Sequence, residues 1–191
     1  MLENIGMGHR DRNRHCYSVS IMKTSNTGRA FIEAFEGLFL QAYDDADDHI
    51  VRPGQAVQGT LTIGYGHTTA AGAPTVYVGM DITNDEADAI LASDLTSVEI
   101  EVQHLVKASL NQAQFDALVS FQFNTGWLAH PQCSLLKALN AGNYALTDQD
   151  FALYDIAGGK VSQGLVRRRK GEAQMFAGNV TVALQTAGAL K

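Results

Sequence analysis

The sequence feature that most constrains the fold is one long stretch of helical periodicity that begins at Thr83. Thr83 and Glu86 form a capping-box pattern, with a threonine at the N-cap and a glutamate three residues later. Apolar residues then recur at spacings of mostly three and four positions, namely Ile90, Leu91, Leu95, Val98, Val102 and Leu105. The pattern predicts one long amphipathic helix over Thr83–Val106.

Shorter elements are predicted on both sides of this helix. Residues 57–79 are rich in glycine, threonine and β-branched side chains, which is typical of short strands and turns. Before them, a helix capped by Ser25, Asn26 or Thr27 is expected to end at Gly37. Further helices are expected at Gln112–Phe123, Ser134–Asn140 and Leu165–Ala177. This order predicts an α+β fold, in which a small β lobe and a larger helical lobe are joined by the long helix.

Composition excludes several classes of protein. The formal net charge is −6, which argues against general nucleic-acid binding, because that usually needs a basic face. No apolar run reaches about 18 residues, so we expect no stable membrane insertion. The two cysteines, Cys16 and Cys133, are expected to be free thiols of a chain made in a reducing compartment.

Two carboxylates stand out as candidates for acid–base chemistry. Glu36 is placed in the last turn of the first predicted helix, where the helix dipole and partial burial both favour a protonated carboxyl. Asp45 follows nine positions later in the loop-like segment AYDDADD, where a solvated aspartate is expected to be ionised. Two carboxylates in contrasting environments are the apparatus of glycoside hydrolysis.

Simpler interpretations of the same residues remain open at this point. A glutamate at a helix end is usually a surface residue, and an acidic loop is usually a solvated face. A calcium loop fits less well, because Asp45–His49 has no glycine at the required turn and no closing glutamate. A zinc site is disfavoured as well, since His67 has no second histidine or cysteine at ligand spacing.

The ordered set of motifs resembles the phage-type lysozymes of glycoside hydrolase family 24. FEGLFLQAYDD and TIGYGHT match the pattern of that family, and so do FNTG at Phe123–Gly126 and the C-terminal AGGKVSQGLVRRRKGEAQMF. The resemblance covers about residues 22–178. It implies a lysozyme-like catalytic domain at 22–180, a disordered upstream extension at 1–21, with Met22 as the natural start, and a tail at 181–191.

The resemblance also implies a reaction and its residues. Glu36, Asp45 and Thr62 fall on the family's catalytic glutamate, aspartate and threonine. Glu36 would protonate the glycosidic oxygen between N-acetylmuramic acid and N-acetylglucosamine, while Asp45 and Thr62 position a water on the opposite face of the sugar. The family implies inversion. No metal and no organic cofactor is expected, and the substrate would be the peptidoglycan glycan strand.

One departure from the family concerns the working aspartate. The connection Ala46–Leu61 is much longer than the family usually has, so the geometry of Asp45 relative to Thr62 is open. Asp44, Asp47 and Asp48 remain alternatives to Asp45. A longer loop costs little free energy, so we expect the fold to survive the insertion.

Four further residues receive expected roles. Arg168 of the run Arg167–Lys170 is expected to approach Glu36 and to contribute to substrate binding, as the resemblance favours. Asn124 offers donors and an acceptor that suit an N-acetyl sugar, although a buried turn asparagine fits equally well. His67 is expected to pair with Asp94 on the long helix, and Trp127 to belong to the core.

The expected biological context is a prophage endolysin, monomeric and held in the bacterial cytoplasm until a holin opens the inner membrane. It would then act on the cell wall from the periplasm. Two alternatives stay open: an antibacterial muramidase effector delivered by a secretion system, and a wall-binding module whose catalysis the insertion has disabled.

Overall fold

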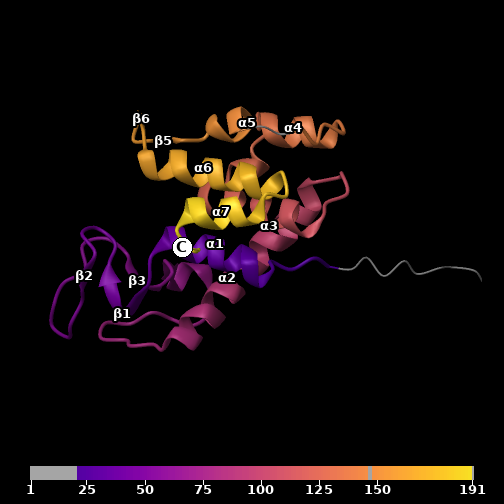
Figure 1. The fold of residues 1–191 in the computed structure, drawn as a ribbon. Coiled ribbons are helices and arrows are strands. Elements are labelled where there is room, and N and C mark those ends of the chain that lie inside the picture. Colours follow the sequence, from indigo (N-terminus) through magenta and orange to yellow (C-terminus); the bar gives the residue numbers. More distant parts are fainter. Residues whose placement is uncertain (1–20, 146–147, 191) are drawn as a thin grey trace, which may run out of the picture.

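The computed structural model describes residues 21–145 and 148–190. The predicted upstream extension at 1–21 lies outside these residues, except for its last position. Figure 1 shows the strands of the N-terminal half gathered at one end of the molecule, whereas a separate two-stranded hairpin lies beside the C-terminal helices. The predicted α+β class is confirmed.

The described chain contains α-helices, short 3₁₀ turns and short β-strands. The helices are α1 (Asn26–Glu36), α2 (Asn84–Leu105), α3 (Gln112–Thr125), α4 (Ser134–Asn140), α5 (Asp148–Ala152), α6 (Gln163–Phe176), α7 (Val180–Ala187) and the 3₁₀ turns η1 (Thr69–Ala71) and η2 (Trp127–Ala129). The strands are β1 (Phe39–Asp44), β2 (His49–Ile50), β3 (Leu61–Gly64), β4 (His67–Thr68), β5 (Ile156–Ala157) and β6 (Lys160–Val161).

Helix α1 begins and ends as its sequence predicts. The Ser25 side chain accepts a hydrogen bond from the Gly28 backbone N–H at 3.1 Å, which caps the N-terminus. The helix ends at Glu36, because Gly37 adopts a φ of 74°, which residues with a Cβ atom disfavour. The first candidate carboxylate is therefore the final residue of α1.

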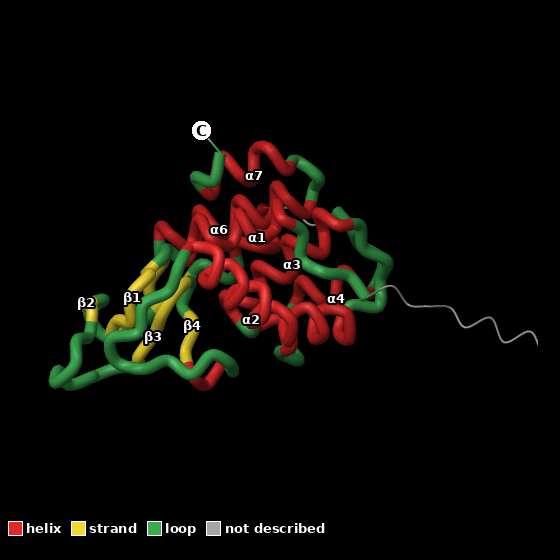
Figure 2. Tube along the Cα trace, turned by 90° about the horizontal axis from the view of Figure 1, so that it is seen from below, coloured by secondary structure: helices red, strands yellow, loops and turns green. Residues whose placement is uncertain are grey.

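The small lobe is a four-stranded antiparallel sheet in the order β2-β1-β3-β4 (Figure 2). Its register pairs Tyr43 with Thr62 and Asp44 with Leu61. Strands β3 and β4 lie in the patch that the sequence predicts, whereas β1 runs into the AYDDADD segment that is expected to be a loop, and β2 is not predicted. The lobe has a small core of its own, made by Ala42, Ile63, Val76 and Met80.

The long helix α2 matches its prediction to within one residue at each end. The Thr83 hydroxyl accepts from the Glu86 N–H at 3.2 Å, and the Glu86 carboxylate accepts from the Thr83 N–H at 2.7 Å, so the capping box is complete. Helix α2 packs against α3 and against strand β3. It therefore links the two lobes.

The C-terminal part corrects the predicted domain boundary. Residues 181–191 were expected to be a tail, but Val180–Ala187 form α7, which packs on α6 and α1. Ala183 and Ala187 are buried in the main core. The folded unit thus extends through this helix, because its small apolar residues cover the outer face of α6.

The Phe31 ring of α1 packs on Gly171 of α6. A Cβ on Gly171 of α6 would lie 2.7 Å from Cε2 of Phe31 on α1, so only glycine allows this packing distance. Arg168 lies three residues before Gly171 on the same face of α6. The close contact therefore brings Arg168 toward the end of α1.

Among the described residues, no helix is both long and apolar enough to cross a membrane.

Candidate active site

Glu36 and Arg168 form the centre of the candidate site. The Arg168 Nη1 atom lies 2.5 Å from the Glu36 Oε1 atom. The Arg168 side chain is 3% exposed and that of Glu36 is 22% exposed, so solvent and ligands reach the glutamate rather than the arginine. The expected approach of Arg168 to Glu36 is thus present. Arg168 also lines the pocket that Glu36 faces.

Glu36 faces a pocket between α1, α3 and α6 with a volume of about 220 Å³. Its walls are made by Phe35, Glu36, Asn124, Ser162, Gly164, Leu165, Arg167 and Arg168. Asn124 lines this pocket, and its side-chain oxygen accepts a hydrogen bond from Arg169 Nη2 at 2.9 Å. The amide is consequently held in one orientation at the pocket wall.

Asp44 is a structural residue of the β lobe rather than a solvated one. It is fully buried, and its carboxylate accepts hydrogen bonds from the backbone N–H groups of Ala46, Gln58 and Gly59. These bonds, led by that of Gln58, lower the pKa of Asp44 below its usual value. All three donors belong to the insertion, so Asp44 clamps both ends of it.

Asp45 lies at the open edge of the same structure. Its backbone N–H donates to the Thr60 carbonyl at 3.1 Å, and its carboxylate accepts from the Thr60 N–H at 2.6 Å. Asp45 is exposed, in contrast to Asp44. The two ends of the insertion are therefore held together by the hydrogen bonds between Asp45 and Thr60.

The sheet register places Asp45 and Thr62 on the same face. Tyr43 pairs with Thr62, and Asp45 bonds Thr60, so these four alternate residues share one face of the β1–β3 pair. The Thr62 hydroxyl donates to the Thr60 carbonyl at 3.0 Å, and Thr62 is 3% exposed. The long insertion thus leaves Asp45 and Thr62 as neighbours across two paired strands.

Tyr43 connects this face electrostatically with Glu36. Burial raises the pKa of the Tyr43 phenol, and the negative charges of Asp48, Asp45 and Glu36 raise it further. The phenol is therefore within electrostatic reach of both candidate catalytic carboxylates. Its ring stacks on Phe39 with centroids 4.1 Å apart, which fixes its position on β1. No pattern in the sequence distinguishes Tyr43.

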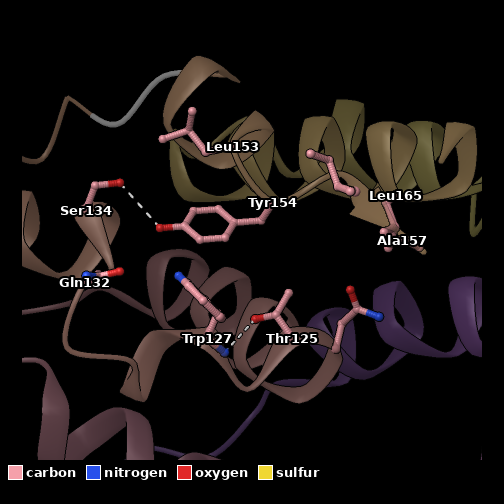
Figure 3. Close-up of a pocket in the computed structure, with 10 residues that line it drawn as sticks. Thr125, Trp127, Gln132, Ser134, Leu153, Tyr154, Ala157 and Leu165 are labelled. Atoms are coloured by element: carbon pink, nitrogen blue, oxygen red, sulfur yellow. Dashed lines mark hydrogen bonds between the residues drawn. The ribbon is translucent and has the colours of Figure 1, made fainter. Parts of the chain in front are cut away.

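A larger hollow of about 760 Å³ adjoins the Glu36 pocket and shares Asn124 and Leu165 with it (Figure 3). Trp127 and Tyr154 face it, and the Tyr154 hydroxyl lies 3.4 Å from the Ser134 hydroxyl. Trp127 is 39% exposed and stacks on His130 with centroids 3.9 Å apart. The expectation that Trp127 belongs to the core is wrong, because the αL residue Gly126 ends α3 and turns the chain outward.

His67 ties the two lobes together, as the sequence predicts. Its Nδ1 atom lies 2.9 Å from an Asp94 carboxylate oxygen on α2, and its Nε2 atom lies 2.8 Å from the Pro74 carbonyl oxygen. The ring is 1% exposed. Since the Pro74 carbonyl can only accept, the ring donates from Nε2 in that bond. His67 therefore has a structural role between strand β4 and helix α2.

Metal ligands do not gather in the described part of the chain. Among residues 21–145 and 148–190, no group of three or more histidine, cysteine, aspartate or glutamate side chains is arranged to hold a metal ion.

Comparison with known proteins gives consistent matches. A family model described as phage lysozyme matches residues 33–172. The endolysin of Bacillus phage PZA is 38% identical over 155 residues, which cover 81% of this chain and 55% of that protein. The endolysin of Salmonella phage P22 is 35% identical over 156 residues, covering 82% of this chain and 99% of that protein. The solved muramidase domain of SpmX from Asticaccaulis excentricus has a TM-score of 0.65 at 36% identity, covering 81% of this chain and 97% of that chain.

The extent of these matches differs between relatives. The chain spans about half the length of the two Bacillus phage endolysins that it matches, 55% for phage PZA and 54% for phage B103, but nearly all of the P22 endolysin. The stretch matched by the family model contains Glu36, Asp45, Thr62, Asn124 and Arg168. The arrangement of helices around a small antiparallel sheet agrees with the solved relatives. This chain belongs to the phage lysozyme family.

Proposed function

We propose that this protein is a lysozyme that hydrolyses the glycosidic bond between N-acetylmuramic acid and N-acetylglucosamine in peptidoglycan. The observation that carries the proposal is the position of Glu36 as the last residue of α1, facing a pocket and held by Arg168. Membership of the phage lysozyme family and the relatives' names, endolysin and muramidase domain, support the same substrate.

In the proposed reaction Glu36 is the general acid. Its carboxyl proton passes to the glycosidic oxygen as the bond between that oxygen and the anomeric carbon breaks. The ion pair with Arg168 fixes the position of the Glu36 side chain at the pocket. The acid would thus be held in place before substrate arrives.

Asp45 is the proposed general base on the other side of the sugar. It would accept a proton from the water that attacks the anomeric carbon, so that one water molecule is consumed for each bond cleaved. Its exposure and its bond to Thr60, beside Thr62, support this role over the buried Asp44. Inversion at the anomeric carbon is the outcome that the family implies. Asn124 is the proposed contact for an N-acetyl group, since it lines the Glu36 pocket.

The biological setting that we propose is lysis of a bacterial host. Several relatives are named endolysin, and two are named SAR-endolysin. Release from the cytoplasm through a holin-dependent lesion, followed by action on the wall as a monomer, is the route that we favour.

Digestion of purified peptidoglycan with mass analysis of the released muropeptides tests the proposed reaction. Reducing muramic acid ends would support hydrolysis, with Glu36→Gln as the inactive control. Anhydromuramic ends would contradict it and indicate a lytic transglycosylase. Binding to peptidoglycan without release of fragments would contradict any catalytic role and leave a wall-binding module.

A further inference from the structure

A second glutamate lies behind the Glu36–Arg168 pair and is fully buried. Glu172 of α6 accepts a hydrogen bond from the Ser120 hydroxyl at 2.7 Å. Its Oε1 atom lies 3.3 Å from Arg168 Nε and 3.0 Å from Arg169 Nη2, and its Oε2 atom lies 2.8 Å from Arg169 Nε. One carboxylate therefore binds two adjacent guanidinium groups.

The two arginines leave Glu172 in different directions. Arg168 reaches Glu36, and its Nη2 atom also donates to the Ser120 carbonyl at 3.3 Å. Arg169 reaches Asn124 at the pocket wall. Their side chains are 3% and 1% exposed, so neither charge is screened well by water. Glu172 is thus a common support for the acid and for the amide that line the same pocket.

The charges alternate along this chain of contacts. Glu36, Arg168, Glu172 and Arg169 carry two negative and two positive charges when both glutamates are ionised. Burial raises the pKa of Glu172, but two guanidinium groups and a hydroxyl donor face its oxygens, which favours the ionised form. An ionised Glu172 offsets one of the two positive charges behind Glu36.

We propose that Glu172 is a positioning residue of the reaction: it holds Arg168 against Glu36 and offsets the arginine charge, so that Glu36 keeps its proton at working pH. This inference rests on the proposed function of Glu36 as general acid. Without the charge of Glu172, two guanidinium groups would act on Glu36 with no opposing charge. Glu36 would then lose its proton at a lower pH.

Other charged groups near the two glutamates are few in the described structure. Arg167 lies over the Phe35 ring, 5.3 Å from its centroid, at the Glu36 pocket. The Tyr43 phenol on β1 is within electrostatic reach of Glu36, and Asp155 acts on Arg169. These groups stay unchanged in the variants below, so the test isolates Glu172 and Arg169.

The test is the pH dependence of kcat/KM for soluble peptidoglycan fragments, with the full chain. Glu172→Gln is expected to move the alkaline limb to lower pH by about one pH unit. Arg169→Gln removes a positive charge and is expected to move the limb to higher pH. The double variant, with both substitutions, is expected to return the limb close to that of the wild type.

Ser120→Ala is the matched control. It removes a hydrogen bond to Glu172 without changing any charge, so the limb is expected to stay in place even where kcat falls. Cooperative thermal melting shows which variants are folded. If Glu172→Gln does not fold, the opposite shift in Arg169→Gln decides the question by itself.

If the alkaline limb of the pH profile stays in place in folded Glu172→Gln and Arg169→Gln proteins, the inference is overturned and Glu172 is a purely structural residue. A wild type that releases no reducing ends would instead contradict the proposed function. In that case the pH at which the Glu36 carboxyl titrates, followed by carbon NMR in wild type and Arg169→Gln, still tests the electrostatic link: a shift to higher pH supports it and no shift overturns it.

Discussion

Glu36 and Arg168, which are 132 positions apart in the sequence, meet at 2.5 Å in the wall of one pocket. The contact joins the end of the first helix to a helix near the other end of the chain. It lies one helical turn from the contact between the Phe31 ring of α1 and Gly171 of α6. The position of the Glu36 carboxyl is thus set by helices of the larger lobe.

Glu36→Gln is expected to lower the rate of peptidoglycan cleavage by about 100- to 10,000-fold, because glutamine has no proton to give to the leaving oxygen. The Tm is expected to stay close to that of the wild type, since the amide oxygen still accepts from Arg168. Muropeptide release and scanning calorimetry measure the two effects. Glu33→Gln, on the same helix but outside the pocket, is the control and should keep activity. Cleavage by Glu36→Gln at the wild-type rate would remove Glu36 from the mechanism.

Asp44→Asn is expected to lower stability, whereas Asp45→Asn is expected to lower activity. Asp45→Asn should reduce kcat by about 100-fold or more at unchanged Tm, because it removes the proposed base. Asp44→Asn should lower Tm by about 5 °C, because an amide accepts the buried N–H bonds of the insertion less well than a carboxylate. Asp48→Asn, the same change on the exposed loop, is the control. An inactive but fully stable Asp44→Asn protein would assign the base to Asp44 instead.

The pH dependence of stability is expected to follow Asp44. Its pKa is lowered in the folded protein relative to a value of 3.8, so it stabilises the fold above about pH 4. That contribution disappears as the pH falls through the lower, folded-state pKa. Wild-type Tm should therefore drop more steeply between pH 5 and about pH 2 than the Tm of Asp44→Asn. Calorimetry across this range measures it, and parallel curves for the two proteins would contradict the prediction.

Breaking the His67–Asp94 pair is expected to destabilise the junction between the lobes. His67→Asn should cost about 3 kcal/mol, because it leaves a largely buried carboxylate with a poorer partner. Urea unfolding of the two single variants and of the double variant with Asp94→Asn gives the coupling energy. The double variant should lose less than the sum of the single losses. Strict additivity would mean that the two side chains do not interact in solution.

Local patterns predicted much of the helical framework. The capping box at Thr83 and Glu86, the cap at Ser25 and the stop at Gly37 are all formed by residues within a few positions of each other. Such features depend on short-range hydrogen bonds and backbone angles, so they are legible in a single sequence. The position of Glu36 at the end of α1 follows from them directly.

Features that depend on tertiary packing could not be predicted from local sequence patterns. No local pattern predicts that Asp44 is buried and Asp45 exposed, because this difference arises from pairing of β1 with β3. Helix α7 has no side-chain hydrogen bond at its N-cap Asn179, and its place in the fold depends on packing against α6 and α1. The hairpin of β5 and β6 has only two residues in each strand, too few for a periodic pattern. Glu172 resembles any helical glutamate until its three partners are known.

The double closure of the insertion, by Asp44 and by the Asp45–Thr60 pair, has a consequence for protein engineering. Gly59 cannot be replaced freely, since a Cβ there would lie 2.7 Å from an Asp44 oxygen. Residues 54–57, by contrast, are exposed and lie beyond both closures. A short epitope or affinity tag spliced between Gly54 and Val57 would project into solvent while the strand pairing behind it stays intact. The protein thus carries a natural grafting point beside the face that holds Asp45 and Thr62.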